Sequence, residues 1–313
     1  MKIKKPYFWD LQKPNILSYL LLPLTIPVVL NNFLLGLNKK KEFHKNIKTI
    51  CVGNIYVGGT GKTPLTIKLS QILKKLDCKT GVVKKFYKNQ HDEQKLIEIK
   101  AKLYCSIERK VALAEAIKDG VDIAIFDDGL QDKSINYNLK FVCFNNMKGI
   151  GNGFLIPAGP LREKINSIYK YDAIIINGAQ KDNNDLKNFF RKFDKNIKIF
   201  ETFYNPININ EFNNKDKYLI FSGVGNPDSF KEILIQNNFN IAKDMRFPDH
   251  HRYNNNDINR IKYHAKKLGS KILTTEKDYI KLNKEMKKEI SYLSIDLSIK
   301  NESELISFIR SKI

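Results

Sequence analysis

The sequence predicts an α/β fold, in which a parallel sheet carries helices on its faces. From residue 47 onward, short apolar runs typical of buried strands alternate with stretches whose apolar residues recur at helical spacing. A glycine-rich turn follows the first of these runs, and a later run ends in two aspartates. Strands that alternate with helices imply right-handed crossovers, and such crossovers join parallel strands.

Residues 47–177 carry the first group of expected elements. A helix over 62–76 is indicated by leucines and isoleucines spaced three or four residues apart, and a second helix from 109 stops at Gly120. The strands of this group are expected at 47–53, 80–85, 121–128, 140–145 and 171–177.

A second group of elements follows the polar stretch 179–196, which is either an exposed helix or a seam between domains. We expect strands at 197–203, 217–225, 271–278 and 290–298, with helices at 229–236 and 302–310. The chain is accordingly divided into an N-terminal membrane-associated helix (1–40), a core lobe (41–195) and a smaller C-terminal α/β lobe (196–313) that completes a cleft. One continuous sheet is the alternative arrangement.

Residues 15–37 form the most apolar segment and are about long enough to cross a bilayer. Two prolines and an Asn-Asn pair argue against a simple span, and no small-residue cleavage site follows, as a secretory signal would require. We expect a helix in the membrane interface, anchored by the aromatic residues 7–9 and by Lys39–Lys41, with both ends on the cytoplasmic side. A buried core helix broken by proline is the alternative.

The net charge indicates the class of partner, and the cysteines indicate the redox compartment. The chain has 54 Lys and Arg against 33 Asp and Glu, a formal net charge of +21, which favours anionic partners. The lysines are spread along the chain, and no arginine cluster with interleaved aromatic residues marks a nucleic-acid groove. The four cysteines occur singly, which indicates neither a disulfide framework nor a zinc site and favours a reducing compartment.

The segment VGNIYVGGTGKTP (residues 52–64) has the form of a phosphate-binding loop, or P-loop, although Tyr56 stands where the usual pattern has its first glycine. It lies between an expected strand and an expected helix, so that backbone N–H groups and the helix N-terminus would face a phosphate. Lys62 would reach the β- and γ-phosphates, and Thr63 would offer its hydroxyl to Mg²⁺. The expected nucleotide-binding residues are Gly58, Gly59, Thr60, Gly61, Lys62 and Thr63.

Acidic residues and histidines supply candidates for the rest of a phosphate-transfer site. Asp127 and Asp128 end an apolar strand, and in parallel sheets that end faces the ligand. Three further segments stand out. The structural alternative for HDEQ (91–94) is a solvated loop, and that for FLIPAGPLRE (154–163) is a rigid surface turn. In RFPDHHRY (246–253) a lone histidine would usually be structural, but two histidines beside Asp249 favour acid–base or ligand work.

Together these segments resemble the tetraacyldisaccharide 4′-kinase family over nearly the whole chain, in the family's order. The matching segments are VGNIYVGGTGKTP, HDE, DDGLQ, PAGPLRE, FSGVGNPDSF, FPDHHRY and TTEKDYIKL. The N-terminal FWD and LLLPLTIP are also similar to the membrane-associated start of the family. The non-glycine at position 56 belongs to the family pattern.

The resemblance implies roles for individual residues. Asp92 and His250 are expected to activate the acceptor hydroxyl, with Lys62 and Asp128 as the other catalytic residues. The expected metal-site residues are Thr63, Asp127, Asp128, Glu163 and Glu93. Three departures are noted: VVKKFYK (82–88) replaces a Ser-Arg-Gly-Tyr-Gly stretch, in which Lys85 would stand in for the arginine, His91 replaces a glycine, and Asp132 replaces a histidine.

The resemblance also implies the activity, which is ATP- and Mg²⁺-dependent phosphorylation of the 4′-hydroxyl of a tetraacyldisaccharide 1-phosphate. The expected partners are this acylated lipid and the anionic surface of the bacterial inner membrane on its cytoplasmic face, without nucleic acid or an obligate protein partner. The alternative is a membrane-associated P-loop switch that hydrolyses nucleotide without a lipid acceptor. A third alternative, a nucleic-acid-binding ATPase, is indicated only by the positive net charge of the chain.

Overall fold

The computed structural model describes residues 5–37, 47–88, 90–178 and 184–313, with only the backbone for 35–37. It divides into two compact units. The first unit comprises Met1–Phe86, Ala101–Phe203 and Ile299–Ile313, and the second comprises Tyr87–Lys100 and Tyr204–Ser298. The predicted lysine anchor Lys39–Lys41 and the start of the polar stretch 179–196 lie outside the described residues.

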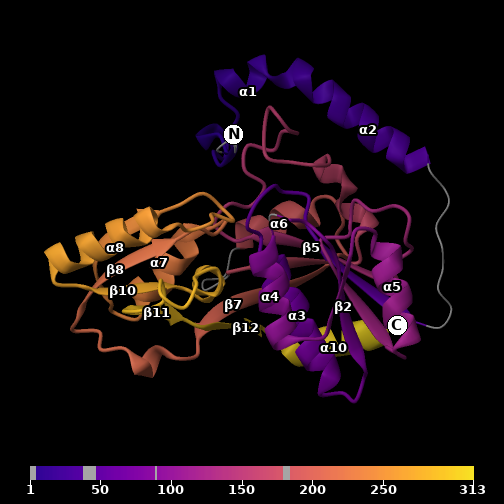
Figure 1. Cartoon of the computed structure of the whole chain (residues 1–313). Coiled ribbons are helices and arrows are strands. Elements are labelled where there is room, and N and C mark those ends of the chain that lie inside the picture. The colour runs from indigo at the N-terminus through magenta and orange to yellow at the C-terminus, as the bar shows by residue number, and fades with distance from the viewer. Residues whose placement is uncertain (1–4, 38–46, 89, 179–183) are drawn as a thin grey trace. The chain divides into compact units, whose positions relative to one another are not determined.

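The larger sheet has eight strands in the order β12-β7-β6-β5-β1-β4-β2-β3, and the strands from β6 to β3 lie entirely in the first unit (Figure 1). Its strands are β1 (Lys48–Gly53), β2 (Thr80–Lys85), β3 (Leu103–Ser106), β4 (Ile123–Asp127), β5 (Leu139–Asn145), β6 (Ala173–Asn177), β7 (Lys198–Pro206) and β12 (Ile295–Ile299). All neighbours from β3 to β7 are parallel. The carboxyl ends of β1, β4 and β2 therefore lie at one edge of the sheet.

Helices cover both faces of this sheet. The helices are α3 (Lys62–Lys74), α5 (Arg109–Lys118), α6 (Asn184–Arg191), α10 (Glu302–Arg310) and the 3-10 helix η3 (Ile165–Lys170). Side chains of α5, η3 and α6 join one apolar cluster with β1, β4, β5 and β6. Outside that cluster, Phe308 of α10 packs on Phe141 and Phe200, and α3 packs on β1, β2 and β4.

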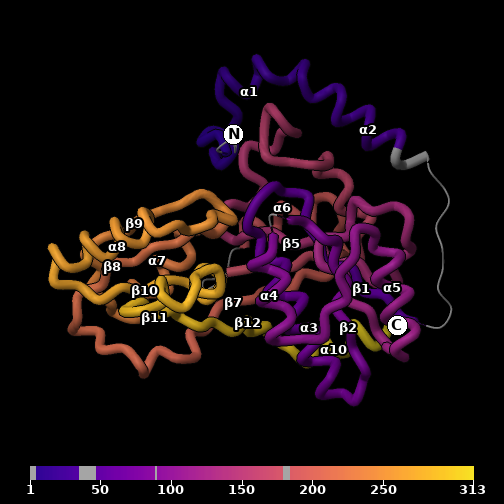
Figure 2. The backbone as a smooth tube through the Cα atoms, viewed as in Figure 1, coloured from indigo at the N-terminus to yellow at the C-terminus, as the bar shows by residue number. Residues whose placement is uncertain are grey.

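The N-terminal segment forms short helices before the sheet begins: η1 (Tyr7–Trp9), α1 (Ile16–Leu20), η2 (Leu22–Thr25) and α2 (Ile26–Leu37). Figure 2 traces α1 and α2 along one curved path. Between them the 3-10 helix η2 carries Pro23 in its first turn, where the missing backbone donor of proline is tolerated. Within the part of the chain that the structure describes, no helix combines the length and apolarity needed to cross a bilayer.

The second unit has a four-stranded sheet in the order β11-β10-β8-β9, with all pairs parallel. Its elements are α4 (His91–Lys100), η4 (Ile209–Glu211), β8 (Lys217–Ser222), α7 (Pro227–Gln236), β9 (Asn240–Arg246), α8 (Asn255–Leu268), β10 (Lys271–Thr275), α9 (Glu276–Ile280) and β11 (Ile290–Leu293). Helix α7 and helix α8 belong to separate apolar clusters on this sheet, and α4 packs against α9.

The predicted α/β class with parallel sheets and flanking helices is confirmed. The structure corrects several local expectations. Segment 91–94, for which a solvated loop was an alternative, begins helix α4, and segment 290–298 is two strands in two different sheets. Strands β3 and β9 and helix α8 were not expected, because β3 is only four residues long and β9 and α8 have few apolar residues. The division at residues 40 and 195 stays a prediction.

Candidate functional site

The phosphate-binding loop lies between β1 and α3, as its sequence predicts. Gly58 and Gly61 have φ values of +117° and +81°, a region that side chains with a Cβ rarely adopt. A Cβ added to Gly58 would meet no atom within 4 Å, so the loop is open at this point. Since α3 begins at Lys62, its free N–H groups face the loop, and they suit the phosphates of ATP.

Two asparagines brace the loop from within the first unit. The Asn54 side-chain amide donates to Thr60 Oγ1 at 3.0 Å and to the Gly58 carbonyl at 3.3 Å. The Asn177 amide, at the end of β6, donates to the Thr60 carbonyl at 2.5 Å. Both asparagine side chains are fully buried. The loop is therefore preorganised by side chains at the carboxyl ends of β1 and β6, which flank β5 in the sheet.

Asp127, at the end of β4, is a buried carboxylate beside the loop. Its Oδ2 accepts from Thr63 Oγ1 at 3.1 Å and lies 2.6 Å from Lys84 Nζ. Its Oδ1 is buried and has no hydrogen-bond partner. Buried oxygens normally have partners, and an orphaned carboxylate oxygen near a threonine hydroxyl suits a Mg²⁺ ion or its bound water.

Asp128 lies among cations. Its φ of +59° is unusual for a residue other than glycine and turns its backbone sharply after β4. Lys62 Nζ lies 3.8 Å from Asp128 Oδ2, and the Arg162 guanidinium lies 3.2 Å from Oδ1. Burial alone would raise the pKa of Asp128, but Lys62 and Arg162 outweigh that effect and lower it. Asp128 is therefore ionised at neutral pH.

Glu163 is held next to this group by two neutral donors. Gln131 Nε2 donates to Oε1 at 3.1 Å, and Tyr171 OH donates to Oε2 at 3.0 Å. Gln131 also accepts from Arg162 at 3.2 Å. A hydrogen-bonded chain thus links Glu163, through Gln131 and Arg162, to Asp128.

The second unit contains an aspartate–histidine pair, in which the aspartate is buried and the histidine is partly exposed. His250 Nδ1 lies 3.0 Å and 3.1 Å from the two carboxylate oxygens of Asp92, which is 6% exposed. Asp92 comes from the first turn of α4, and His250 has a φ of +55° in the loop after β9. With Nδ1 donating to the carboxylate, the basic lone pair of a neutral imidazole lies on Nε2.

Two lysines of the segment TTEKDYIKL surround this pair. Lys281 Nζ lies 3.5 Å and Lys277 Nζ 3.7 Å from Asp92 Oδ2. Lys277 also pairs with Glu93 Oε1 at 3.0 Å. Burial alone would lower the pKa of Lys277, but Glu93 and nearby aspartates outweigh it and raise the pKa. The pair therefore lies among charges of both signs, because Glu93 and Asp249 each place a carboxylate oxygen 3.7 Å from His250 Nε2.

The structure brings the predicted residues together in two groups. The first group lies in the first unit and consists of Lys62, Thr63, Asp127 and Asp128. Glu163 is linked to this group through the hydrogen bonds of Gln131 and Arg162. Asp92, His250 and Glu93 meet in the second unit. Of the five predicted metal-site residues, Thr63 and Asp127 are in direct contact, whereas Glu93 pairs with Lys277. Among the described residues, no three His, Cys, Asp or Glu side chains form a metal-binding cluster.

Sequence reasoning missed several residues of these groups. Asn177 and Lys84 lie at strand ends whose neighbours in the sheet are distant in sequence, and Arg162 was noted without a role. Lys84 stands one position before Lys85, the residue that was expected to replace the family's arginine. Lys84 is the buried penultimate residue of β2, whereas Lys85, which ends the strand, is only partly buried.

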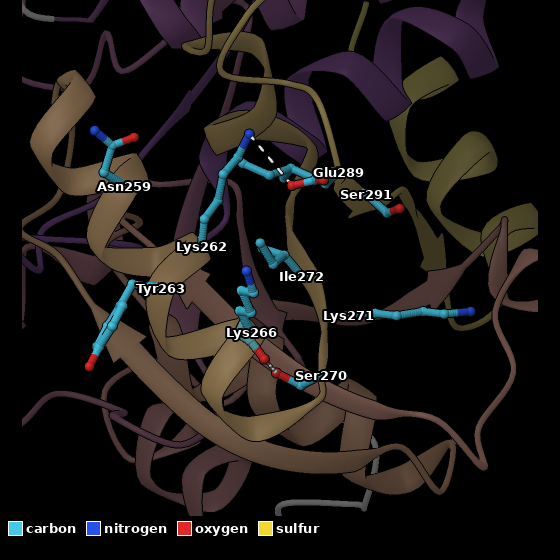
Figure 3. A pocket seen from close by; sticks show the side chains of 11 residues that line it. Asn259, Lys262, Tyr263, Lys266, Ser270, Lys271, Ile272, Glu289 and Ser291 are labelled. Carbon is cyan, nitrogen blue, oxygen red and sulfur yellow. Dashed lines mark hydrogen bonds and ion pairs between the residues drawn. The ribbon is translucent and has the colours of Figure 1, made fainter.

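A large groove of about 950 Å³ lies elsewhere in the second unit, along α8, β10 and β11. Figure 3 shows that its polar side chains do not converge, because Tyr263 and Lys271 point away from the groove and Lys262 is paired with Glu289. The groove contains none of the predicted site residues, so its size does not make it the reaction site.

A parallel sheet with this loop at the carboxyl end of β1 and acids at the end of β4 defines a nucleotide-binding protein of the P-loop class. The family profile described as tetraacyldisaccharide-1-P 4′-kinase matches residues 16–102 and 91–313. The chain belongs to this family.

Individual relatives agree with this membership. The tetraacyldisaccharide 4′-kinase of Pelagibacter ubique (strain HTCC1062) is 46% identical over 310 residues, which cover 97% of this chain and 96% of that protein. The enzyme of the same name from Rickettsia conorii is 33% identical over 328 residues, 98% of each chain. The crystal structure of the apo form of LpxK from Aquifex aeolicus, in complex with ATP, has a TM-score of 0.70 at 22% identity and covers 95% of this chain and 99% of that one. It shows the same fold.

Proposed function

We propose that this chain transfers the γ-phosphoryl group of ATP to the 4′-hydroxyl of a tetraacyldisaccharide 1-phosphate. Family membership supports the reaction. The observation that supports the assignment of residues is the Asp92–His250 pair, because a sugar hydroxyl that attacks the γ-phosphorus must lose its proton and this pair offers a base that can accept it. The bond from the γ-phosphorus to the acceptor oxygen forms as the bridge to the β-phosphate breaks.

The residues of the first unit hold the phosphates and neutralise their charge. Lys62 and the N–H groups at the start of α3 bind the β- and γ-phosphates, and Arg162 adds a planar cation beside Asp128. Thr63 and Asp127 fit a Mg²⁺ ion, which when bound would draw charge from the phosphate oxygens. Asp127 contributes through the buried Oδ1, since its Oδ2 is occupied by Thr63 and Lys84.

The residues of the second unit accept the proton. His250 Nε2 takes the proton of the 4′-hydroxyl, and Asp92 orients the ring through Nδ1 and stabilises the imidazolium that forms. Such assistance contributes about 10²–10⁴-fold to the rate. Lys277 and Lys281 hold the Asp92 carboxylate in its ionised form.

The N-terminal segment supports association with the membrane on its cytoplasmic face, where the acyl chains of the acceptor remain in the bilayer. Large apolar side chains of α1, η2 and α2 are exposed: Ile16, Leu17, Tyr19, Leu20, Leu22, Leu24, Ile26, Val29, Leu30, Phe33 and Leu34. A contiguous exposed apolar surface of this kind marks an interaction site, and a helix lying in the interface buries such a face.

The test is to incubate the full chain with γ-labelled ATP, Mg²⁺ and the acylated disaccharide 1-phosphate in mixed micelles. We expect label on the lipid, and Lys62→Ala should remove it, by at least about 100-fold, because the phosphates lose their main cation. Lys74→Ala, an exposed lysine on the same helix, is the control. Hydrolysis of ATP that the lipid neither redirects nor stimulates would favour the nucleotide switch instead.

A further inference from the structure

The residue that breaks the P-loop pattern, Tyr56, contacts the N-terminal segment. Tyr56 is 1% exposed, and its ring packs with Leu155 and Leu161. Its hydroxyl donates to the carboxylate of Asp10, which also pairs with Lys5. Asp10 follows η1 and precedes the apolar helices. The residue at the first-glycine position of the phosphate-binding loop is therefore hydrogen-bonded to the part of the chain proposed to meet the lipid surface.

The ionisation states of this contact suit a charge-assisted hydrogen bond. Burial and the Asp10 carboxylate raise the pKa of Tyr56, so the phenol keeps its proton and donates it. Burial opposes ionisation of Asp10, but hydrogen bonds from Lys5 and Tyr56 outweigh it and lower the pKa of Asp10. Hydrogen bonds with one charged partner are shorter and stronger than neutral ones. At neutral pH the protonated Tyr56 hydroxyl therefore donates a hydrogen bond to the ionised Asp10 carboxylate.

The same N-terminal segment also holds the loop that lies beside Tyr56. Trp9 Nε1 donates to the Pro157 carbonyl at 3.0 Å, and Asn32 Nδ2 donates to the Arg162 carbonyl at 2.8 Å. That loop is in turn bonded to the start of the P-loop, since Arg162 N donates to the Ile55 carbonyl at 2.7 Å. Residues 55–57 are therefore held on one side by Asp10 and on the other by a turn that the segment itself fixes.

We propose that Asp10 is a positioning residue for the phosphate-binding loop: through Tyr56 it fixes the entry of the loop, so that the N-terminal segment sets the affinity for ATP as well as meeting the lipid. This inference rests on the proposed function only in requiring that the loop binds ATP. Neither residue is among those expected to bind the phosphates, which are Gly58 to Thr63. The contact acts by holding residues 55–57 in the conformation from which the N–H groups of the loop converge.

The test measures the dissociation constant of ATP by calorimetry, with the full chain in detergent micelles and no lipid acceptor. Tyr56→Phe keeps the buried ring and removes the hydroxyl, and Asp10→Asn removes the charge. Each should weaken ATP binding about tenfold, which corresponds to about 1.4 kcal/mol. The double variant should bind no more weakly than the weaker single variant, because Asp10, Lys5 and the Tyr56 hydroxyl form one hydrogen-bonded group.

Tyr104→Phe is the matched control. Tyr104 is also buried, and its hydroxyl donates to Asp119 Oδ2 at 2.9 Å, but this pair joins the edge strand β3 to the end of α5. A purely structural role predicts lower melting temperatures for Tyr56→Phe and Tyr104→Phe alike, with unchanged affinity for ATP, and that result would overturn the inference. Additive effects of the two substitutions at positions 10 and 56 would also overturn it. A wild-type chain that binds ATP but phosphorylates no lipid overturns the proposed function alone.

Discussion

At the scale of single residues, His250 and His251 are neighbours in the chain with different partners. His250 Nδ1 is bonded to the buried Asp92. His251 stacks on Phe247, with ring centroids 4.8 Å apart, and its Nε2 lies 2.9 Å from Asp257 Oδ2. Asp257 completes the capping box of α8 with Asn254. The first histidine is therefore bound to a site residue, and the second is tied to the start of a helix.

We expect His250→Ala to lower kcat by about 10²–10⁴-fold with little change in the KM for ATP, because only proton acceptance is lost. His251→Ala should instead lower the melting temperature, since it removes a ring contact and one partner of Asp257, and should leave kcat of the folded enzyme near the wild-type value. Steady-state kinetics and thermal unfolding of both variants check this. If kcat falls further for His251→Ala than for His250→Ala, then His251 is the proton acceptor and His250 is the structural residue.

Asp92 also makes stability depend on pH. Burial alone would raise its pKa, but the hydrogen bond from His250 and the charge of Lys277 outweigh burial and lower the pKa to about 2, from an ordinary value near 4. A carboxyl group whose pKa is lowered on folding stabilises the protein above its unfolded pKa. That contribution is lost as the pH falls from about 4 to about 2.

The prediction is that Asp92→Asn lowers the free energy of unfolding by roughly 2 kcal/mol at pH 7, and that this difference from wild type shrinks between pH 4 and pH 3. Urea unfolding at pH 7, 4 and 3 measures it. Glu98→Gln, an exposed carboxylate on the same helix, is the control and should change stability little at any pH. A difference independent of pH would mean that Asp92 contributes by packing alone.

At the scale of elements, a lysine side chain of strand β2 lies against the carboxyl end of strand β4. Lys84 and Asp127 form an ion pair at 2.6 Å with side chains 3% and 0% exposed. A buried charge that loses its partner costs about 3–5 kcal/mol, whereas replacement of both charges by apolar residues is often neutral. Strands β2 and β4 are therefore joined by a buried ion pair as well as by their parallel backbone pairing.

Lys84→Met should accordingly lower the free energy of unfolding by about 3 kcal/mol, and Lys84→Met combined with Asp127→Leu should recover most of that loss without recovering kinase activity. Chemical denaturation and the labelled-ATP assay measure the two quantities. Lys48→Met, an exposed lysine on β1, is the control for removal of a surface charge. If the double variant is less stable than the single one, the pair is not the source of the cost.

The elements also show what could be predicted from sequence. The loop, β4 and its two aspartates were predicted because each is contained in one local segment with its own pattern. The bracing by Asn177 and the ion pair of Lys84 depend on the order of strands in the sheet, which no local pattern contains. Strand β9 (NIAKDMR) lacks alternation, and α8 presents only Ile258, Ile261 and Ala265 to the core. Their formation therefore depends on tertiary packing and capping more than on periodicity.

At the scale of the whole molecule, the exposed apolar side chains of the N-terminal segment are proposed to enter a lipid surface. The prediction is that the double change Ile26→Asp and Leu30→Asp abolishes binding to vesicles of anionic phospholipid. These side chains are 64% and 55% exposed, and insertion of each contributes about 1.5–3 kcal/mol. The loss of both should lower the partition coefficient by at least about 100-fold. Co-sedimentation with vesicles measures it.

A single exposed isoleucine outside the segment provides the matched control. Ile107 is 72% exposed in the first unit, before α5, and Ile107→Asp should leave vesicle binding unchanged. Kinase assays with two forms of the acceptor distinguish membrane binding from phosphoryl transfer. The double variant should lose activity on acceptor embedded in vesicles. It should regain activity on acceptor in mixed micelles, where the lipid reaches the protein without a bilayer. Undiminished sedimentation of the double variant would show that the apolar face is not the membrane contact, and that lysines elsewhere on this strongly basic chain carry the attraction.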